Sequence, residues 1–78
     1  MMRFFFDTSI DESHMRDEEG LEYAGLARAR QDARRSLAAL VAEALGRDAH
    51  HCAVTVRDSG GKVIVRFFAD LGEDVSTA

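Results

Sequence analysis

The fold is decided by residues 26–46, which read LARARQDARRSLAALVAEALG. Up to Leu45 this stretch contains no proline or glycine, and it consists mainly of alanine, arginine and leucine, all good helix formers. At 100° per residue its apolar side chains fall in one stripe. The stripe consists of Leu26, Ala29, Ala33, Leu37, Leu40, Val41 and Ala44. The pattern predicts an amphipathic helix that begins after Gly25, a poor N-terminal cap, and stops at Gly46.

The residues before the helix predict a hairpin. Residues 2–7, MRFFFD, are short, aromatic and bounded by polar residues, which is typical of a strand. We expect a short returning strand at 13–16, with Met15 as its only large apolar side chain. Residues 17–20, DEEG, predict a turn, because carboxylates can accept local backbone hydrogen bonds and glycine can take a positive φ.

The residues after the helix predict a second hairpin. Strand-like stretches at 52–58 and 62–69 flank residues 58–61, DSGG, which is a strong turn signal. Pairing Val56 with Val63 places an apolar residue opposite every apolar residue of the inner face. A slip of one residue would set a valine opposite an arginine, so we predict the register that pairs Val56 with Val63.

Together these elements predict an α+β domain with the order β-β-α-β-β. One long amphipathic helix should pack on one face of a four-stranded sheet made of two hairpins. The first strand, 2–7, and the last, 62–69, carry apolar residues on both faces, so we expect them to form the central pair. The domain should occupy residues 1–70, and residues 71–78 should form a frayed C-terminal tail.

The composition is that of a small intracellular domain. Cys52 is the only cysteine, which excludes a disulfide within the chain. No secretory leader is recognisable and the longest apolar run, 37–42, is too short to span a bilayer, so we expect a cytoplasmic protein without membrane contact. Ten Lys and Arg residues stand against 14 Asp and Glu residues, and the net charge of −4 disfavours non-specific binding of nucleic acid.

No residue pattern indicates catalysis, a metal site or a cofactor. His51 and Cys52 could supply zinc ligands, but neighbouring strand residues point to opposite faces, so we interpret them as a surface histidine beside a core cysteine. The carboxylates at 17–19 lack the alternation of a calcium loop and are better explained as a solvated turn. No serine or cysteine lies in a recognisable nucleophile motif. We therefore expect a protein that is not an enzyme and binds no cofactor.

The most informative feature is the sheet face that a single helix must leave open. Apolar side chains edged by arginines are expected there, and exposed patches of this kind often mark interfaces. The candidate interface residues are Phe5, Ile64, Phe68, Arg57 and Arg66. The leading hypothesis is a non-enzymatic protein-interaction module that forms a homodimer through this face or its edge.

Two alternatives use the same surfaces. Bases of single-stranded nucleic acid could stack on Phe5 and Phe68 while arginines meet phosphates, although the negative net charge weakens this hypothesis. An adaptor could instead offer a sheet edge, or the arginine-rich face of the helix, to another protein. A salt-sensitive affinity for oligonucleotides would distinguish the first alternative from the second.

Four motifs follow one another along the chain. They are RFFFD at 3–7, DEEGLE at 17–22, the Ala/Arg-rich helix and VRDSGGKV at 56–63. In this order and spacing they resemble a family of short bacterial proteins that is catalogued only as a domain of unknown function. Two positions differ, because Phe4 stands where the family often has tyrosine and Gly25 replaces an acidic or polar residue. The resemblance implies a stand-alone bacterial domain, and it transfers no catalytic or binding residue.

Overall fold

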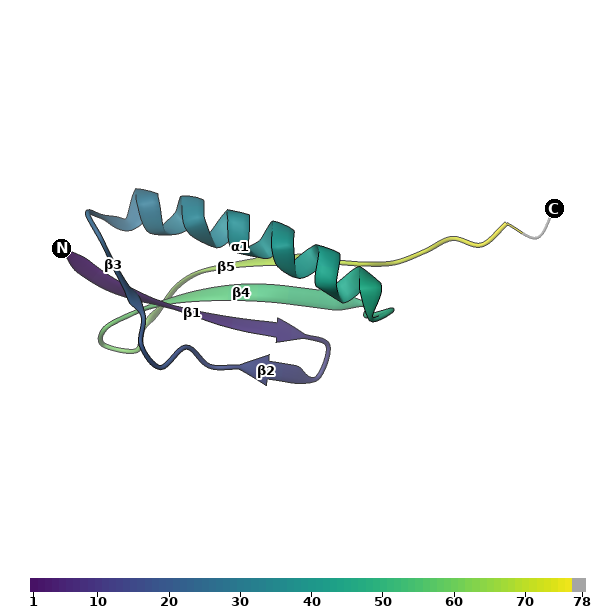
Figure 1. Cartoon of the computed structure of the whole chain (residues 1–78), viewed down its shortest axis with the longest axis horizontal. Helices are drawn as coiled ribbons and strands as arrows, with labels where there is room; N and C mark the ends of the chain where they lie inside the picture. Colours follow the sequence, from purple (N-terminus) through teal and green to yellow (C-terminus); the bar gives the residue numbers. More distant parts are fainter. Residues whose placement is uncertain (77–78) are drawn as a thin grey trace.

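A computed structural model describes residues 1–76 as one antiparallel sheet with a single helix lying along one of its faces (Figure 1). The predicted α+β class is confirmed, but the sheet has five strands rather than four. The additional strand lies between the predicted turn and the helix. The elements are β1 (Met2–Ile10), β2 (Ser13–Met15), β3 (Leu21–Tyr23), α1 (Leu26–Gly46), β4 (His51–Asp58) and β5 (Val63–Asp70).

The strand order is β2-β1-β4-β5, and β3 also pairs with β1. Strands β2 and β3 share one edge of β1: β2 pairs with Thr8–Ile10 and β3 with Met2–Phe4. The central pair is therefore β1 and β4, and the prediction that the last strand is central is wrong. The misleading residue is Arg57, whose charge suggests an exposed strand, although its side chain is paired with a carboxylate from β1 and buried.

The C-terminal hairpin has a different register from the predicted one. Val56 lies opposite Val65 rather than Val63, a shift of two residues that keeps the same side chains on the same faces. A bulge between Val56 and Arg57 and a three-residue loop closed by Gly61, at φ 86°, absorb the difference.

The core forms where α1 packs on β4 and β1. All seven residues of the predicted apolar stripe belong to it, which confirms the predicted buried face of the helix. The fully buried Ala29, Ala33 and Ala44 let the helix approach Val54 and Cys52 closely. Strand β3 is joined to the helix by Tyr23, whose hydroxyl donates to Asp32 Oδ2 at 2.9 Å, and burial raises the pKa of Tyr23 to about 12.

The two ends of the helix are capped to different degrees. Gly25 caps the N-terminus with extended backbone and no side-chain hydrogen bond, as the sequence predicts. At the other end the left-handed residue is Asp48, at φ 55°, and not Gly46. Ala49 N donates to Ala44 O at 2.9 Å and Asp48 N to Leu45 O at 3.2 Å, which together form a Schellman motif.

The predicted tail begins beside β4. Leu71 N donates to His50 O at 2.8 Å, and residues 72–76 run away from the sheet without regular secondary structure (Figure 1). Residues 77 and 78, also part of the predicted tail, lie outside the described residues.

Candidate functional site

The five predicted interface residues lie in two separate groups. Phe5 and Arg57 are opposite each other on β1 and β4, on the sheet face away from the helix. Arg66 and Phe68 lie on the edge strand β5, where the Arg66 guanidinium carbon is 5.4 Å from the Phe68 ring centroid. Ile64 is the extra residue of the β-bulge and is half-buried. The predicted residues therefore form two groups, one at the centre of the sheet and one on its edge strand, and not one continuous patch.

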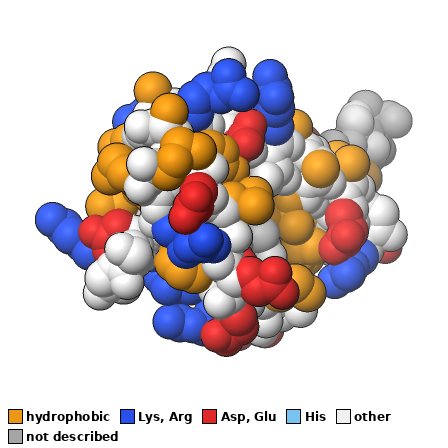
Figure 2. All heavy atoms as spheres, turned by 60° about the vertical axis from the view of Figure 1, so that its left-hand side comes forward, with side chains coloured by type: hydrophobic (Ala, Val, Ile, Leu, Met, Phe, Trp, Pro, Cys, Tyr) orange, Lys and Arg blue, Asp and Glu red, His pale blue; other side chains and the backbone are white. Residues whose placement is uncertain are grey.

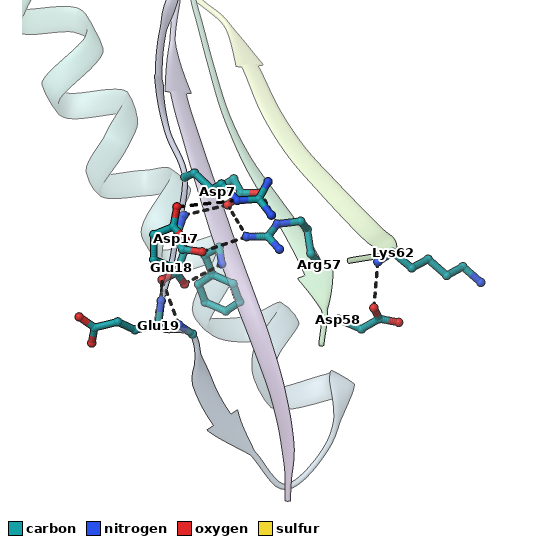
Figure 3. A network of polar contacts seen from close by, with 10 residues as sticks. Asp7, Asp17, Glu18, Glu19, Arg57, Asp58 and Lys62 are labelled. Carbon is teal, nitrogen blue, oxygen red and sulfur yellow. Dashed lines mark hydrogen bonds and ion pairs between the residues drawn. The ribbon is translucent and has the colours of Figure 1, made fainter. Parts of the chain in front are cut away.

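The central cluster is built around Arg57 and consists of Phe5, Asp7, Asp17 and Arg57, the Arg57 clasp. Figure 3 shows Asp7, Asp17 and Arg57 pointing toward one another. Arg57 Nε donates to Asp7 Oδ2 at 2.5 Å, and one terminal nitrogen donates to Asp7 Oδ1 at 3.1 Å and to Asp17 O at 2.9 Å. The guanidinium carbon also lies 4.9 Å from the centroid of the Phe5 ring. Arg57 is only 8% exposed, and three of the five N–H donors of its guanidinium make hydrogen bonds within the chain.

Asp17 fills the gap between β2 and β3 along the edge of β1. Its Oδ2 accepts from Phe6 N at 3.0 Å, where a continuous partner strand would otherwise accept. Its Oδ1 accepts from Glu19 N at 3.1 Å and Gly20 N at 3.0 Å (Figure 3). The predicted solvated turn misses this role of Asp17. The sequence signal for it is an aspartate three residues before a glycine, which is typical of an Asx turn.

Gly20 completes this arrangement. Its φ is +69°, and a Cβ built there would lie 2.8 Å from Phe4 O and 3.0 Å from the Phe5 ring. Only glycine fits this position without displacing β1. The loop at 17–20 is therefore held against the outer face of the sheet and covers Phe5.

Both carboxylates of the clasp are adapted to the charged form. The hydrogen bond from Arg57 lowers the pKa of Asp7 below its ordinary value. Burial alone would raise the pKa of Asp17, but hydrogen bonds from three backbone N–H groups outweigh it and hold the pKa below its ordinary value. The charges of the clasp are thus paired with one another or with backbone groups, and their role is to stabilise the fold.

The edge group joins Phe68 and Arg66 to His51 and Asp70. The His51 ring stacks on Phe68 with centroids 5.9 Å apart. Asp70 Oδ1 lies 2.7 Å from His51 Nδ1, and an Arg66 nitrogen lies 3.1 Å from His51 Nε2. A guanidinium can only donate, so in this arrangement Nε2 accepts and Nδ1 donates to Asp70. The carboxylate–imidazole pair resembles the orienting half of a catalytic triad, but Nε2 faces a guanidinium and not a hydroxyl or thiol.

The cysteine and histidines that could suggest a metal do not converge. Cys52 is buried on the helix side among Ala44 and Ile10, where burial raises the pKa of its thiol, whereas His51 lies on the opposite face. Within residues 1–76 no three His, Cys, Asp or Glu side chains are arranged to hold a metal ion.

The helical arginines lie along the upper edge of the molecule, where Figure 2 shows basic side chains gathered. Arg30 and Arg34 bend over the edge strand, with guanidinium carbons 5.9 and 5.5 Å from the Phe67 ring centroid. Their stems thus cover the side of β5 that faces the helix. Arg28 and Arg35 are also exposed and lie on the side of α1 opposite its buried stripe.

In the described part of the chain α1 is the one helix, and it lacks an apolar stretch long enough to cross a membrane. No curated protein and no solved structure matches the sequence significantly. Residues 3–70 match the model of a protein family described as a domain of unknown function, DUF6894. This match covers most of the chain and confirms the resemblance to a domain of unknown function. The chain therefore belongs to the DUF6894 family of domains of unknown function.

Proposed function

We propose that this domain is a non-enzymatic, cytoplasmic protein-interaction module that forms a homodimer through the free edge of β5. The observation that carries the proposal is the edge itself. Among the described residues β5 pairs only with β4, and it runs for eight residues without a proline. Phe68 and Val63 on this strand are each 56% exposed. Long apolar edges of this kind readily add a strand from another chain.

The backbone of β5 offers a regular set of bonds to a partner strand. Leu71 N donates to His50 O, so the backbone groups of residue 71 face β4. Successive residues of a strand direct their N–H and C=O groups to alternate edges. The groups of Arg66, Phe68 and Asp70 therefore point away from β4, toward the open edge.

A second copy of β5 fits this edge by its charges. If two antiparallel copies are centred on Phe68, Phe68 lies opposite Phe68 and Arg66 lies opposite Asp70 of the second copy. The symmetry produces this opposite-charge pair twice, on either side of an aromatic pair. Centring the pairing on Arg66 would set two arginines opposite each other, which disfavours that register.

Nucleic-acid binding has less support than dimerisation. That hypothesis requires at least two aromatic rings open to stacking, and the Phe5 ring is partly covered by Arg57 and the loop at Gly20. Phe68 is the remaining exposed aromatic of the predicted pair. The dimer requires only features of β5 and is therefore the preferred function.

The test is a charge reversal with its rescue, read as solution mass by light scattering. Arg66→Glu should convert the dimer to a monomer, because the introduced carboxylate would oppose Asp70 of the second copy. Combining Arg66→Glu with Asp70→Arg should restore the dimer, because both pairs are reversed together. Arg35→Glu on the helix is the matched control and should remain dimeric. A dimer that survives Arg66→Glu, or that Arg35→Glu disrupts equally, would contradict the proposal.

A further inference from the structure

A hollow lies on the outer face of the sheet beside the Arg57 clasp. Its volume is about 290 Å³, at the lower limit of ligand pockets, so it suits a small molecule better than a polymer. Polar and basic side chains predominate in its lining. They include Asp7, Ser9, His14, Arg16, Thr55 and Arg66.

The strand registers place these residues in one row across the sheet. Asp7 lies opposite Thr55, and Thr55 lies opposite Arg66. Arg16 directly follows Met15, which pairs with Thr8, so it stands beside Asp7 at the other end of the row. Three interstrand steps separate the two arginines by about 14 Å at the backbone. Both side chains line the same hollow and can approach one ligand from opposite sides.

The hollow carries an excess of positive charge. Among the described residues, Asp7 is the one acidic residue that lines it, and both Asp7 oxygens already accept from Arg57. Within residues 1–76, Arg16 makes only a loose ion pair with Glu18, at 3.9 Å between two exposed side chains. Arg66 directs one of its nitrogens to His51, which leaves further guanidinium donors for a ligand. Arg16 and Arg66 thus face a hollow in which the charge of Asp7 is already neutralised by Arg57.

We propose that this hollow binds a small molecule through a phosphate group. Arg16 and Arg66 hold the phosphate from opposite sides, since guanidinium groups match its oxygens in charge and geometry. The hydroxyls of Ser9 and Thr55 on the floor donate further hydrogen bonds. The site lies toward β2. Arg66 is the one residue that it shares with the proposed pairing of β5.

The first probe is inorganic phosphate, titrated into the full chain at constant ionic strength and followed by amide NMR shifts. Saturable shifts are expected around Ser9 and Thr55. Arg16→Ala should weaken binding at least about tenfold, because it removes charge-assisted bonds. Arg35→Ala removes the same charge from the helix and should leave the affinity unchanged.

Two results would overturn the proposal. One is a set of weak, unsaturable shifts that Arg16→Ala and Arg35→Ala reduce equally, which would indicate general charge attraction. The other is tight, salt-sensitive binding of a short single-stranded oligonucleotide while phosphate and glycerol 3-phosphate fail to bind, which would indicate a nucleic-acid surface. Solution mass measured on Arg16→Ala separates this site from the dimer, because the mass should match that of the wild type.

Discussion

Replacing Asp17 with alanine tests whether one carboxylate holds the edge of the sheet together. Asp17→Ala removes the acceptor of Phe6 N, Gly20 N and Glu19 N. The bonds from Phe6 and Gly20 are partly buried and charge-assisted, at about 1.5 kcal/mol each, whereas water can replace the exposed bond from Glu19. The free energy of unfolding should therefore fall by about 3 kcal/mol. A chain of this size has about 4–12 kcal/mol in total.

Thermal unfolding followed by circular dichroism is the assay. For a domain of this size, 1 kcal/mol corresponds to about 4–8 °C in Tm, so Asp17→Ala should lower Tm by about 12–24 °C. Asp17→Asn should give about half that loss, because its amide oxygen can still accept from Gly20 while its NH₂ group faces Phe6 N–H. All variants must be compared at one protein concentration, since dimerisation makes Tm depend on concentration.

The matched control is Glu18→Ala, which removes the neighbouring carboxylate. The Glu18 side chain is 80% exposed and has only the loose contact with Arg16, so its loss should change stability by less than about 0.5 kcal/mol. The reasoning is refuted if Asp17→Ala and Glu18→Ala lower Tm by the same small amount.

Three further perturbations test other parts of the structure. Because the folded-state pKa values of Asp7 and Asp17 lie below ordinary ones, their stabilisation is complete above the ordinary value of 3.8 and is lost as pH falls toward the folded values. Urea titrations should show this acid-side loss, and Asp17→Asn should reduce it; an unchanged profile would argue against the assignment. Gly20→Ala should cost at least about 2 kcal/mol in chemical denaturation, because its Cβ would meet Phe4 O at 2.8 Å, and a neutral effect would contradict the close packing. Asp48→Gly should raise stability by about 1 kcal/mol by relieving a left-handed backbone, and destabilisation would contradict the Schellman geometry.

The helix was predictable because its signal is long and periodic. The seven stripe residues recur over about five turns and fix which face of the helix is buried, and all seven belong to the core. Strand β3 was not predictable in the same way, because three residues carry no period and its pairing depends on the turn set by Asp17 and Gly20. The register of the second hairpin was missed because a bulge adds a residue without leaving a pattern in the sequence.

The candidate site was partly predictable for a related reason. Alternation correctly assigned Phe5 and Arg57 to the outer face, but it could not show that Asp7 would neutralise Arg57 there. That pairing depends on β1 lying next to β4, a neighbour relation that strand patterns alone do not specify. Opposite charges on the outward faces of two apolar strands are the clue that could have suggested it.

The central claim is that β5 joins a second copy of the chain, and the solution mass of the wild-type protein tests it most directly. Light scattering across a wide concentration range should give twice the 8.6 kDa monomer mass at high concentration and should fall toward 8.6 kDa on dilution. A mass that stays at 8.6 kDa at every concentration would contradict the account and leave the edge of β5 to a different partner.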